Sequence, residues 1–311
     1  MSSKKTSKLS QVDKGLLVID NFLPDYKSYR DSIETRFKDP FDAKSERFVW
    51  DYWNVKDQYC LLRTPLEAIF SEDQCQNLLE TLGVFAQQEL GLMALSHPWV
   101  SAYTEGCFQD FHTDPNHGPW AFVLSLNPKD FFQNSKGGQT RILKSFTESN
   151  HAESLSRNAK ERNDIFHSVS IEANQLCVFD PRRPHMVERV SGPTNILESR
   201  IVIHGWFTDP QPFLEGELAD SALQETIDIC LQQAEAFFEG HALSGCAVLK
   251  VARRGSEVSV HFGRHHLVDL ETQLYLSDAW QEPMQQAISK ELEAISFDDS
   301  QFELTLPIVY E

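Results

Sequence analysis

Residues 111–128, "FHTDPNHGPWAFVLSLNP", contain three side chains that can bind a metal, and a run of apolar residues follows them. His112, Asp114 and His117 stand within six positions, and a strand-like run begins at Trp120. In a strand, side chains at positions i and i+2 point to the same face, so His112 and Asp114 can point side by side into a barrel. An H-x-D pair alone also fits a polar turn, and a metal site needs a further ligand from a distant strand. His117 is interpreted as a loop residue or part of a pocket rim.

The surrounding sequence, from about residue 97 to residue 210, alternates short strand-like runs with turn signals. The runs are "WVSAYT", "FQDFHTD", "WAFVLSLN", "TRILKSF", "HSVSIEA", "QLCVFDP", "MVERVS" and "RIVIHGWF". So many short strands in this length predict a β-sandwich or barrel. The polar residues 147–164 are predicted to form a loop or short helix inserted between strands.

Helical and mixed segments flank this β-rich part. A strand is predicted within residues 15–26, a short helix over 26–37, and one or two amphipathic helices over 64–92. After residue 210 the pattern predicts a helix (219–240), a hairpin turning near Arg254 and Gly255, a helix (278–295) and a last strand (302–310). We therefore predict a disordered tail (1–14), a β-rich domain with N-terminal supporting helices (15–210) and a small C-terminal α+β domain (211–311).

Composition excludes several classes of protein. The 311 residues are 41% hydrophobic with a formal net charge of −18, which disfavours general binding to nucleic acid or anionic membranes. No run of apolar residues approaches the length of a membrane span. The basic N-terminus is not followed by the apolar stretch that a secretory signal requires. The six cysteines contain no C-x-x-C pair, so nothing indicates a structural zinc site or a disulfide framework. We expect a cytoplasmic protein.

His185, in "FDPRRPHMVERV", fits as the distant ligand, because it lies 71 residues after Asp114 in the same β-rich segment. Two histidines and one carboxylate form the facial triad of non-heme Fe(II) oxygenases. A further strand begins fifteen residues later, and its alternate residues share one face: Arg200, Val202, His204 and Trp206. An arginine inside a barrel is costly unless it meets an anion, and a bound dicarboxylate would supply one.

These residues resemble the 2-oxoglutarate- and Fe(II)-dependent dioxygenases, and most closely the prolyl-hydroxylase-like branch. The resemblance covers roughly residues 97–208 and the "VIDNFLPDY" opening. It rests on the order H-x-D…H…R together with Tyr103–Gly106 (Y-x-x-G), "LSLNP", "GGQTRI" and "R-x-x-x-x-G-W-F". One departure is Val202, where members often have Ser or Thr.

The resemblance implies a double-stranded β-helix (jelly-roll) core and a role for each matched position. His112, Asp114 and His185 would bind Fe(II), and Arg200 would pair with the distal carboxylate of 2-oxoglutarate. Further residues follow by position: Tyr103 and Ser125 as helpers in cosubstrate binding, and Trp206, His204 and Arg141 in the substrate pocket.

The implied activity is hydroxylation coupled to decarboxylation of 2-oxoglutarate, with dioxygen as the oxidant and ascorbate as a candidate reductant. The leading substrate is a prolyl residue of a protein or peptide, or free proline. One alternative is a hydroxylase of another small molecule or natural product. Another, from a different class, is a non-enzymatic jelly-roll sensor that binds metal or 2-oxoglutarate. The acidic, amphipathic helices of the C-terminal domain are compatible with a homodimer or with docking of a partner.

Overall fold

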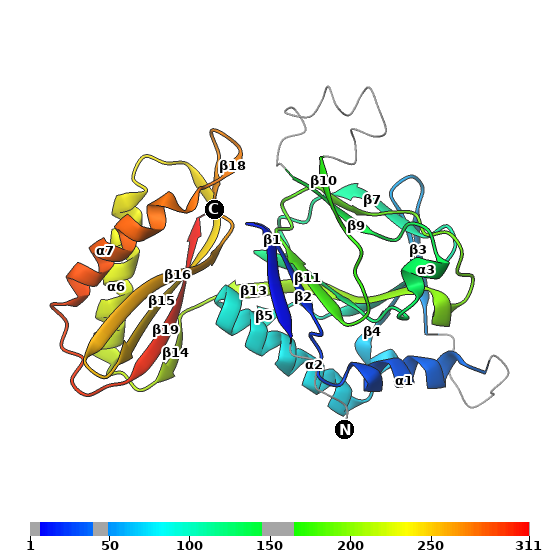
Figure 1. The fold of residues 1–311 in the computed structure, drawn as a ribbon, viewed down its shortest axis with the longest axis horizontal. Helices are drawn as coiled ribbons and strands as arrows, with labels where there is room; N and C mark the ends of the chain where they lie inside the picture. The colour runs from blue at the N-terminus through cyan, green and yellow to red at the C-terminus, as the bar shows by residue number, and fades with distance from the viewer. Residues whose placement is uncertain (1–6, 40–48, 145–164, 311) are drawn as a thin grey trace. The chain divides into compact units, whose positions relative to one another are not determined.

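The computed structural model describes residues 7–39, 49–144 and 165–310. Its contacts divide the chain into two compact units, Met1–Thr81 with Leu95–Phe207, and Leu82–Ala94 with Thr208–Glu311. We call them the β unit and the C-terminal unit; Figure 1 shows the fold of each. The predicted insertion at 147–164 lies outside the described residues. No helix in the described ranges has the length and apolar character that crossing a membrane requires.

The β unit is a curled antiparallel sheet with helices beside it (Figure 1). Its strands are β1 (Lys8–Asp13), β2 (Leu16–Asp20), β3 (Asp51–Val55), β4 (Tyr59–Pro65), β6 (Trp99–Tyr103), β7 (Phe108–His112), β8 (Trp120–Ser125), β9 (Thr140–Leu143), β10 (Phe166–Val169), β11 (Gln175–Phe179), β12 (His185–Val187) and β13 (Arg200–Pro210). Its helices are α1 (Tyr26–Phe37), η1 (Leu66–Ala68), α3 (Phe131–Asn134), η4 (Ile196–Glu198) and the first part of α2 (Glu72–Phe85). The predicted jelly-roll fold class is confirmed.

Strand order places the predicted ligands on neighbouring strands. The sheet runs β1-β2-β11-β8-β13-β6-β4-β7-β12-β9-β10, with β3 paired to β4. β7 and β12, which are far apart in the sequence, pair so that His112 lies opposite His185. β13 pairs with β6 so that Arg200 lies opposite Tyr103. The topology thus gathers side chains from four strands.

The predicted disordered tail is wrong for residues 8–13, which form β1. β1 pairs antiparallel with β2, from Lys8 opposite Asp20 to Asp13 opposite Leu16. All of its residues are exposed or half-buried, so the sequence lacks the apolar alternation of a buried strand. This segment is ordered by its pairing with the apolar β2 and by the ion pairs of Asp13 with Arg183 and His167.

The C-terminal unit is a second antiparallel sheet with two helices packed on it (Figure 1). It contains η2 (Ala86–Leu90), β5 (Leu92–Leu95), β14 (Phe213–Gly216), α6 (Asp220–Phe237), β15 (Leu243–Arg254), β16 (Glu257–His265), β17 (Val268–Asp269), β18 (Leu274–Tyr275), η5 (Asp278–Trp280), α7 (Gln281–Leu292) and β19 (Phe302–Tyr310). The hairpin of β15 and β16 turns at Gly255, where φ is +66°, a conformation that favours glycine.

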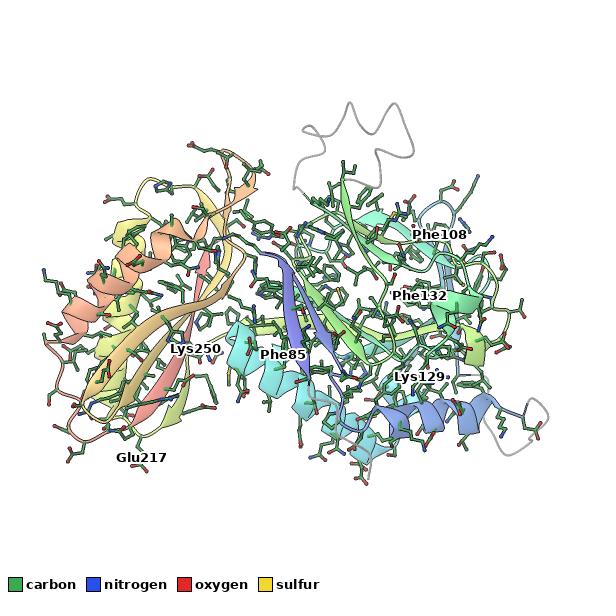
Figure 2. All side chains as sticks on the ribbon, viewed as in Figure 1. Phe85, Phe108, Lys129, Phe132, Glu217 and Lys250 are labelled. Carbon is green, nitrogen blue, oxygen red and sulfur yellow. The ribbon has the colours of Figure 1, made fainter. Side chains whose placement is uncertain are left out.

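Each unit has its own apolar interior, and Figure 2 shows the side chains of both units. In the C-terminal unit, Ile288 of α7 and Ala234 of α6 pack against Leu249 of β15 and Leu304 of β19. In the β unit, Ala121, Ile142 and Cys177 belong to a buried cluster that Trp206 contacts. The cluster in the β unit forms part of one wall of the cavity described below.

Candidate metal centre

His112, Asp114 and His185 converge at one point of the β unit. His112 ends β7, Asp114 follows two residues later, and His185 begins β12. One ligand atom from each lies within 4.8 Å of the others. The Asp114 Oδ2 atom is 3.7 Å from the Nε2 atom of each histidine, and the two rings have centroids 4.2 Å apart. The three residues therefore form a compact set of metal donors, with two histidines and one carboxylate.

Backbone carbonyls fix the orientation of both imidazoles. The Nδ1 atom of His112 donates to the carbonyl of Asp110, and that of His185 to the carbonyl of Arg183, each at 2.8 Å. Because Nδ1 carries the proton, Nε2 keeps its lone pair for a metal. The Nε2 lone pair of His112 accepts a hydrogen bond from the Gln109 amide at 3.0 Å, and a metal ion would take that place.

The surroundings favour the protonation states that metal binding requires. Burial lowers the pKa of His112, and the neighbouring His185 lowers it further. Burial alone would raise the pKa of Asp114, but the nearby His185 and His112 outweigh this effect, so the pKa lies below its ordinary value. The lowered pKa of His112 and the ionised carboxylate of Asp114 favour binding of a divalent ion, and two histidines with one carboxylate suit Fe(II).

Arg200 is a buried cation in the same cavity. It is 1% exposed, and its Nη2 atom donates to the Thr140 hydroxyl at 3.1 Å. Its Nε and Nη1 atoms are buried and have no hydrogen-bond partner among the described residues. Its guanidinium lies 4.7 Å from the centroid of the Tyr103 ring. Burial lowers the pKa of Arg200, because desolvation disfavours the charged form of the guanidinium.

Tyr103 and Ser125, which are predicted to help Arg200 bind the cosubstrate, differ in their position relative to the cavity. Tyr103 is buried, lines the cavity and donates its hydroxyl to the Gln109 amide oxygen at 3.4 Å. Ser125 is fully buried, and its hydroxyl accepts a hydrogen bond from the backbone N–H of Asn127 at 3.1 Å. It does not line the cavity. The hydroxyl beside Arg200 belongs instead to Thr140, which sequence reasoning missed although it lies in the quoted "GGQTRI" motif.

Arg141 is predicted to lie in the substrate pocket, but its side chain does not face the cavity. Its side chain forms an ion pair with Glu188, whereas Thr140, its neighbour in β9, lines the cavity. Successive residues of a strand point to opposite faces, so only one of the two can face inward. The pairing of Thr140 with Val187 of β12 sets which residue that is. The prediction that Arg141 lies in the substrate pocket is therefore wrong.

The cavity has a volume of about 210 Å³ and includes the predicted wall residues His204 and Trp206. The His117 ring packs edge-on against Trp206 with centroids 4.4 Å apart, so His117 is a rim residue. Nε2 of His204 shares a hydrogen bond of 2.8 Å with the Ser101 hydroxyl. Arg63, which the sequence analysis did not select, also lines this cavity.

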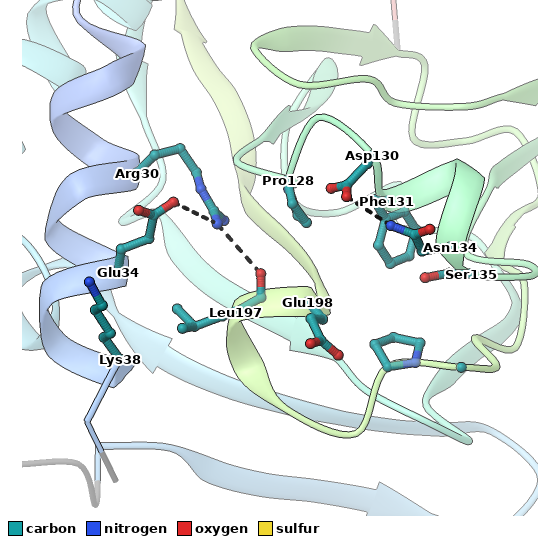
Figure 3. Close-up of a pocket in the computed structure, with 12 residues that line it drawn as sticks. Arg30, Glu34, Lys38, Pro128, Asp130, Phe131, Asn134, Ser135, Leu197 and Glu198 are labelled. Carbon is teal, nitrogen blue, oxygen red and sulfur yellow. Dashed lines mark hydrogen bonds and ion pairs between the residues drawn. The ribbon is translucent and has the colours of Figure 1, made fainter.

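A larger cavity of about 560 Å³ lies elsewhere in the β unit and contains none of these residues (Figure 3). Its polar groups largely bind one another. Arg30 donates to the carbonyl of Leu126 at 2.8 Å and pairs with Glu34 at 3.5 Å, and Asp130 accepts from Asn134 at 2.8 Å. The candidate site is therefore the smaller cavity.

Comparison with known proteins gives similarity of fold only. No protein-family model and no curated protein matches the chain. Among solved structures it is similar to a prolyl-4-hydroxylase from Pseudomonas putida, with 20% identity, a TM-score of 0.44, and coverage of 63% of this chain and 92% of that chain.

Two further structures are similar over the same share of this chain. One is a prolyl hydroxylase from Trichoplax adhaerens in complex with a hypoxia inducible factor oxygen degradation domain peptide fragment (14% identity, TM-score 0.44, 84% of that chain). The other is SnoN, a non-heme alpha ketoglutarate dependent epimerase from nogalamycin biosynthesis (13% identity, TM-score 0.42, 78% of that chain). The site's own residues carry the functional argument.

Proposed function

We propose that this chain is a 2-oxoglutarate- and Fe(II)-dependent dioxygenase that hydroxylates its substrate. The observation that carries the proposal is the buried Arg200 guanidinium, with two unpartnered nitrogens, in the same cavity as the His112–Asp114–His185 donor set. A metal-binding structural protein has no need for a desolvated cation beside its metal. A cosubstrate with a carboxylate at each end could bind the metal with one end and Arg200 with the other.

Each residue has a defined task in this proposal. His112, Asp114 and His185 would hold Fe(II) from one side. Arg200 would bind the distal carboxylate of 2-oxoglutarate through its free donors, with the Thr140 hydroxyl beside it and the Tyr103 ring beneath it. When bound, the metal and cosubstrate would react with dioxygen as the oxidant: one oxygen atom would enter succinate as 2-oxoglutarate loses carbon dioxide, and the other would convert a substrate C–H bond to C–OH. The protein contributes placement and shielding from water.

The substrate we propose first is a prolyl group, in a protein or peptide or as free proline. The resemblance of the sequence motifs to the prolyl-hydroxylase-like branch supports this choice, and another small molecule is the alternative. The cavity volume of about 210 Å³ is compatible with either, because only the reacting group has to enter.

An anaerobic titration with Fe(II) and 2-oxoglutarate tests the proposal. The chelate should give a weak visible charge-transfer band in the wild type and no band in Asp114→Ala. Arg200→Gln should keep metal binding but weaken 2-oxoglutarate by about 2 kcal/mol or more, roughly thirtyfold in Kd. A folded wild type that gives no band would contradict the proposal.

Succinate release separates the enzyme from the non-enzymatic sensor. Supplied with Fe(II), ascorbate, dioxygen and 2-oxoglutarate, an oxygenase releases some succinate even without its substrate, and Asp114→Ala should not. A wild type that forms the band but releases no succinate would favour the sensor.

A further inference from the structure

Arg63 is a second cation of the cavity, and the proposed function gives it no task. It lies in β4, opposite Ser101 of β6, and its side chain lines the cavity that contains Arg200 and the metal ligands. Ser101 in turn holds His204 through their shared hydrogen bond. Arg63 is therefore built into the wall near His204 and is not a surface arginine.

The contacts of Arg63 engage the face of its guanidinium and leave its donors free. The Cζ atom lies 4.1 Å from the centroid of the Trp99 ring and 4.9 Å from that of Trp53. Stacking of this kind uses the π face, whereas the N–H donors lie in the guanidinium plane. The Nε atom is buried and has no hydrogen-bond partner among the described residues. A guanidinium in the cavity wall with an unpartnered Nε–H can bind a carboxylate through hydrogen bonds.

The charges that face the cavity do not balance Arg63. Burial first, and then the charges of Arg63 and Arg200, lower the pKa of His204 to about 3, so this histidine is neutral. Asp114 is the carboxylate of the described cavity wall, and it belongs to the metal ligands. A divalent metal with Asp114 and a 2-oxoglutarate dianion beside Arg200 would leave one positive charge unbalanced, and that charge is on Arg63.

We propose that Arg63 binds the carboxylate of the substrate, so that the substrate is a small carboxylic acid such as a free amino acid and not an internal residue of a protein. This inference rests on the proposed function. An internal residue would bring no carboxylate to Arg63, whose Nε atom is buried and has no hydrogen-bond partner among the described residues.

Calorimetry on the anaerobic Fe(II)–2-oxoglutarate complex tests this assignment. The probes are the common L-amino acids, each compared with its own carboxamide, which keeps the shape and removes the negative charge. At least one acid should bind the wild type, and its amide should bind at least about tenfold more weakly. Arg63→Gln should bind that acid as weakly as the wild type binds the amide, and Arg63→Lys should recover part of the difference.

Two controls make the result specific to Arg63. Arg254→Gln changes the same residue type at an exposed turn of the C-terminal unit and should leave acid binding unchanged. The Kd of 2-oxoglutarate should stay within about twofold of wild type in Arg63→Gln, whereas Arg200→Gln weakens it. The charge-transfer band verifies that Arg63→Gln is folded, and Arg63→Lys serves if that variant does not fold.

Each contrary outcome has a distinct meaning. If acids and amides bind alike, or no acid binds with a Kd below about 10 mM, Arg63 does not recognise a carboxylate. If Arg63→Gln weakens 2-oxoglutarate as strongly as Arg200→Gln, Arg63 belongs to the cosubstrate site; either result overturns the inference and leaves the proposed function standing. A missing charge-transfer band in the wild type would instead remove the proposed function and, with it, this inference.

Discussion

Asp13, the last residue of β1, connects the N-terminal strand to the strand that carries His185. Its Oδ2 atom lies 3.1 Å from Nη2 of Arg183 and 3.1 Å from Nε2 of His167. The Arg183 side chain is fully buried, and its Nε atom also donates to the carbonyl of Leu143 at 2.8 Å. The carbonyl of Arg183 in turn orients His185. Loss of the Asp13 charge should therefore affect both stability and the metal site.

The structure gives the size of this effect. Burial alone would raise the pKa of Asp13, but the hydrogen bond with His167 and the charge of Arg183 outweigh it and lower the pKa to about 2, from an ordinary value of 3.8. At 1.36 kcal/mol for each pH unit, this depression corresponds to about 2 kcal/mol. A carboxyl whose folded pKa is depressed stabilises the protein above its unfolded pKa. This contribution is lost as the pH falls from 3.8 towards 2.

Asp13→Asn should lower the free energy of unfolding at pH 7 by at least about 2 kcal/mol, because the buried Arg183 also loses its counter-ion. Urea unfolding of the metal-free protein measures this. Asp31→Asn, an exposed residue of α1, is the matched control and should change stability by less than about 0.5 kcal/mol. In an Arg183→Met background the cost of Asp13→Asn should shrink, since the cation is gone.

Equal unfolding free energies for wild type and Asp13→Asn at pH 7 would refute this reasoning. So would an unchanged cost in the Arg183→Met background, which would mean that Asp13 acts without the cation. A loss of Fe(II) affinity in Asp13→Asn, with Asp31→Asn unaffected, would show in addition that the link reaches His185.

Three further predictions concern the cavity and its walls. Arg200→Met should stabilise the metal-free protein by about 2 kcal/mol in urea unfolding, because it removes two buried unpartnered nitrogens, while calorimetry should detect no 2-oxoglutarate binding. Gly205→Ala should lower stability by about 1–3 kcal/mol and reduce Tm, because its Cβ atom would lie 2.8 Å from the Ser96 hydroxyl and 3.1 Å from the Phe122 ring. His204, with its pKa lowered to about 3, should show no imidazole titration by NMR between pH 8 and about 5 in the metal-free protein. Because the unfolded histidine binds a proton at higher pH than the folded one, this residue makes stability rise with pH between about 3 and 6.5.

The sequence predicted the elements and metal ligands that have a local pattern. Period-two alternation identified strands such as β13, whose inward residues include Arg200 and Trp206, and the H-x-D spacing predicted two ligands that share a face. The third ligand followed from its position in the same β-rich segment. These features depend on residues near one another in the chain.

What the sequence left open depends on pairing between distant strands. The choice between Thr140 and Arg141 needs the register of β9 on β12, which no local pattern encodes. Arg63 falls at the border of a segment predicted as helical, and only the pairing of β4 with β6 brings it to the cavity. β1 has a polar sequence and is ordered by contacts with residues more than 150 positions away.

The net charge of the chain and the charge of its cavity have opposite signs, and local groups decide what the cavity binds. The formal net charge is −18, yet Arg63 and Arg200 face the cavity together with the single carboxylate of Asp114 among the described lining residues. At physiological salt the Debye length is about 8 Å, so more distant surface carboxylates are screened. Groups that line the cavity act on a ligand at contact, and a buried cation without an anion, as at Arg200, is costly. In the proposals above Arg200 and Arg63 each bind an anion, and because the two anions would belong to different molecules, their affinities can be measured separately.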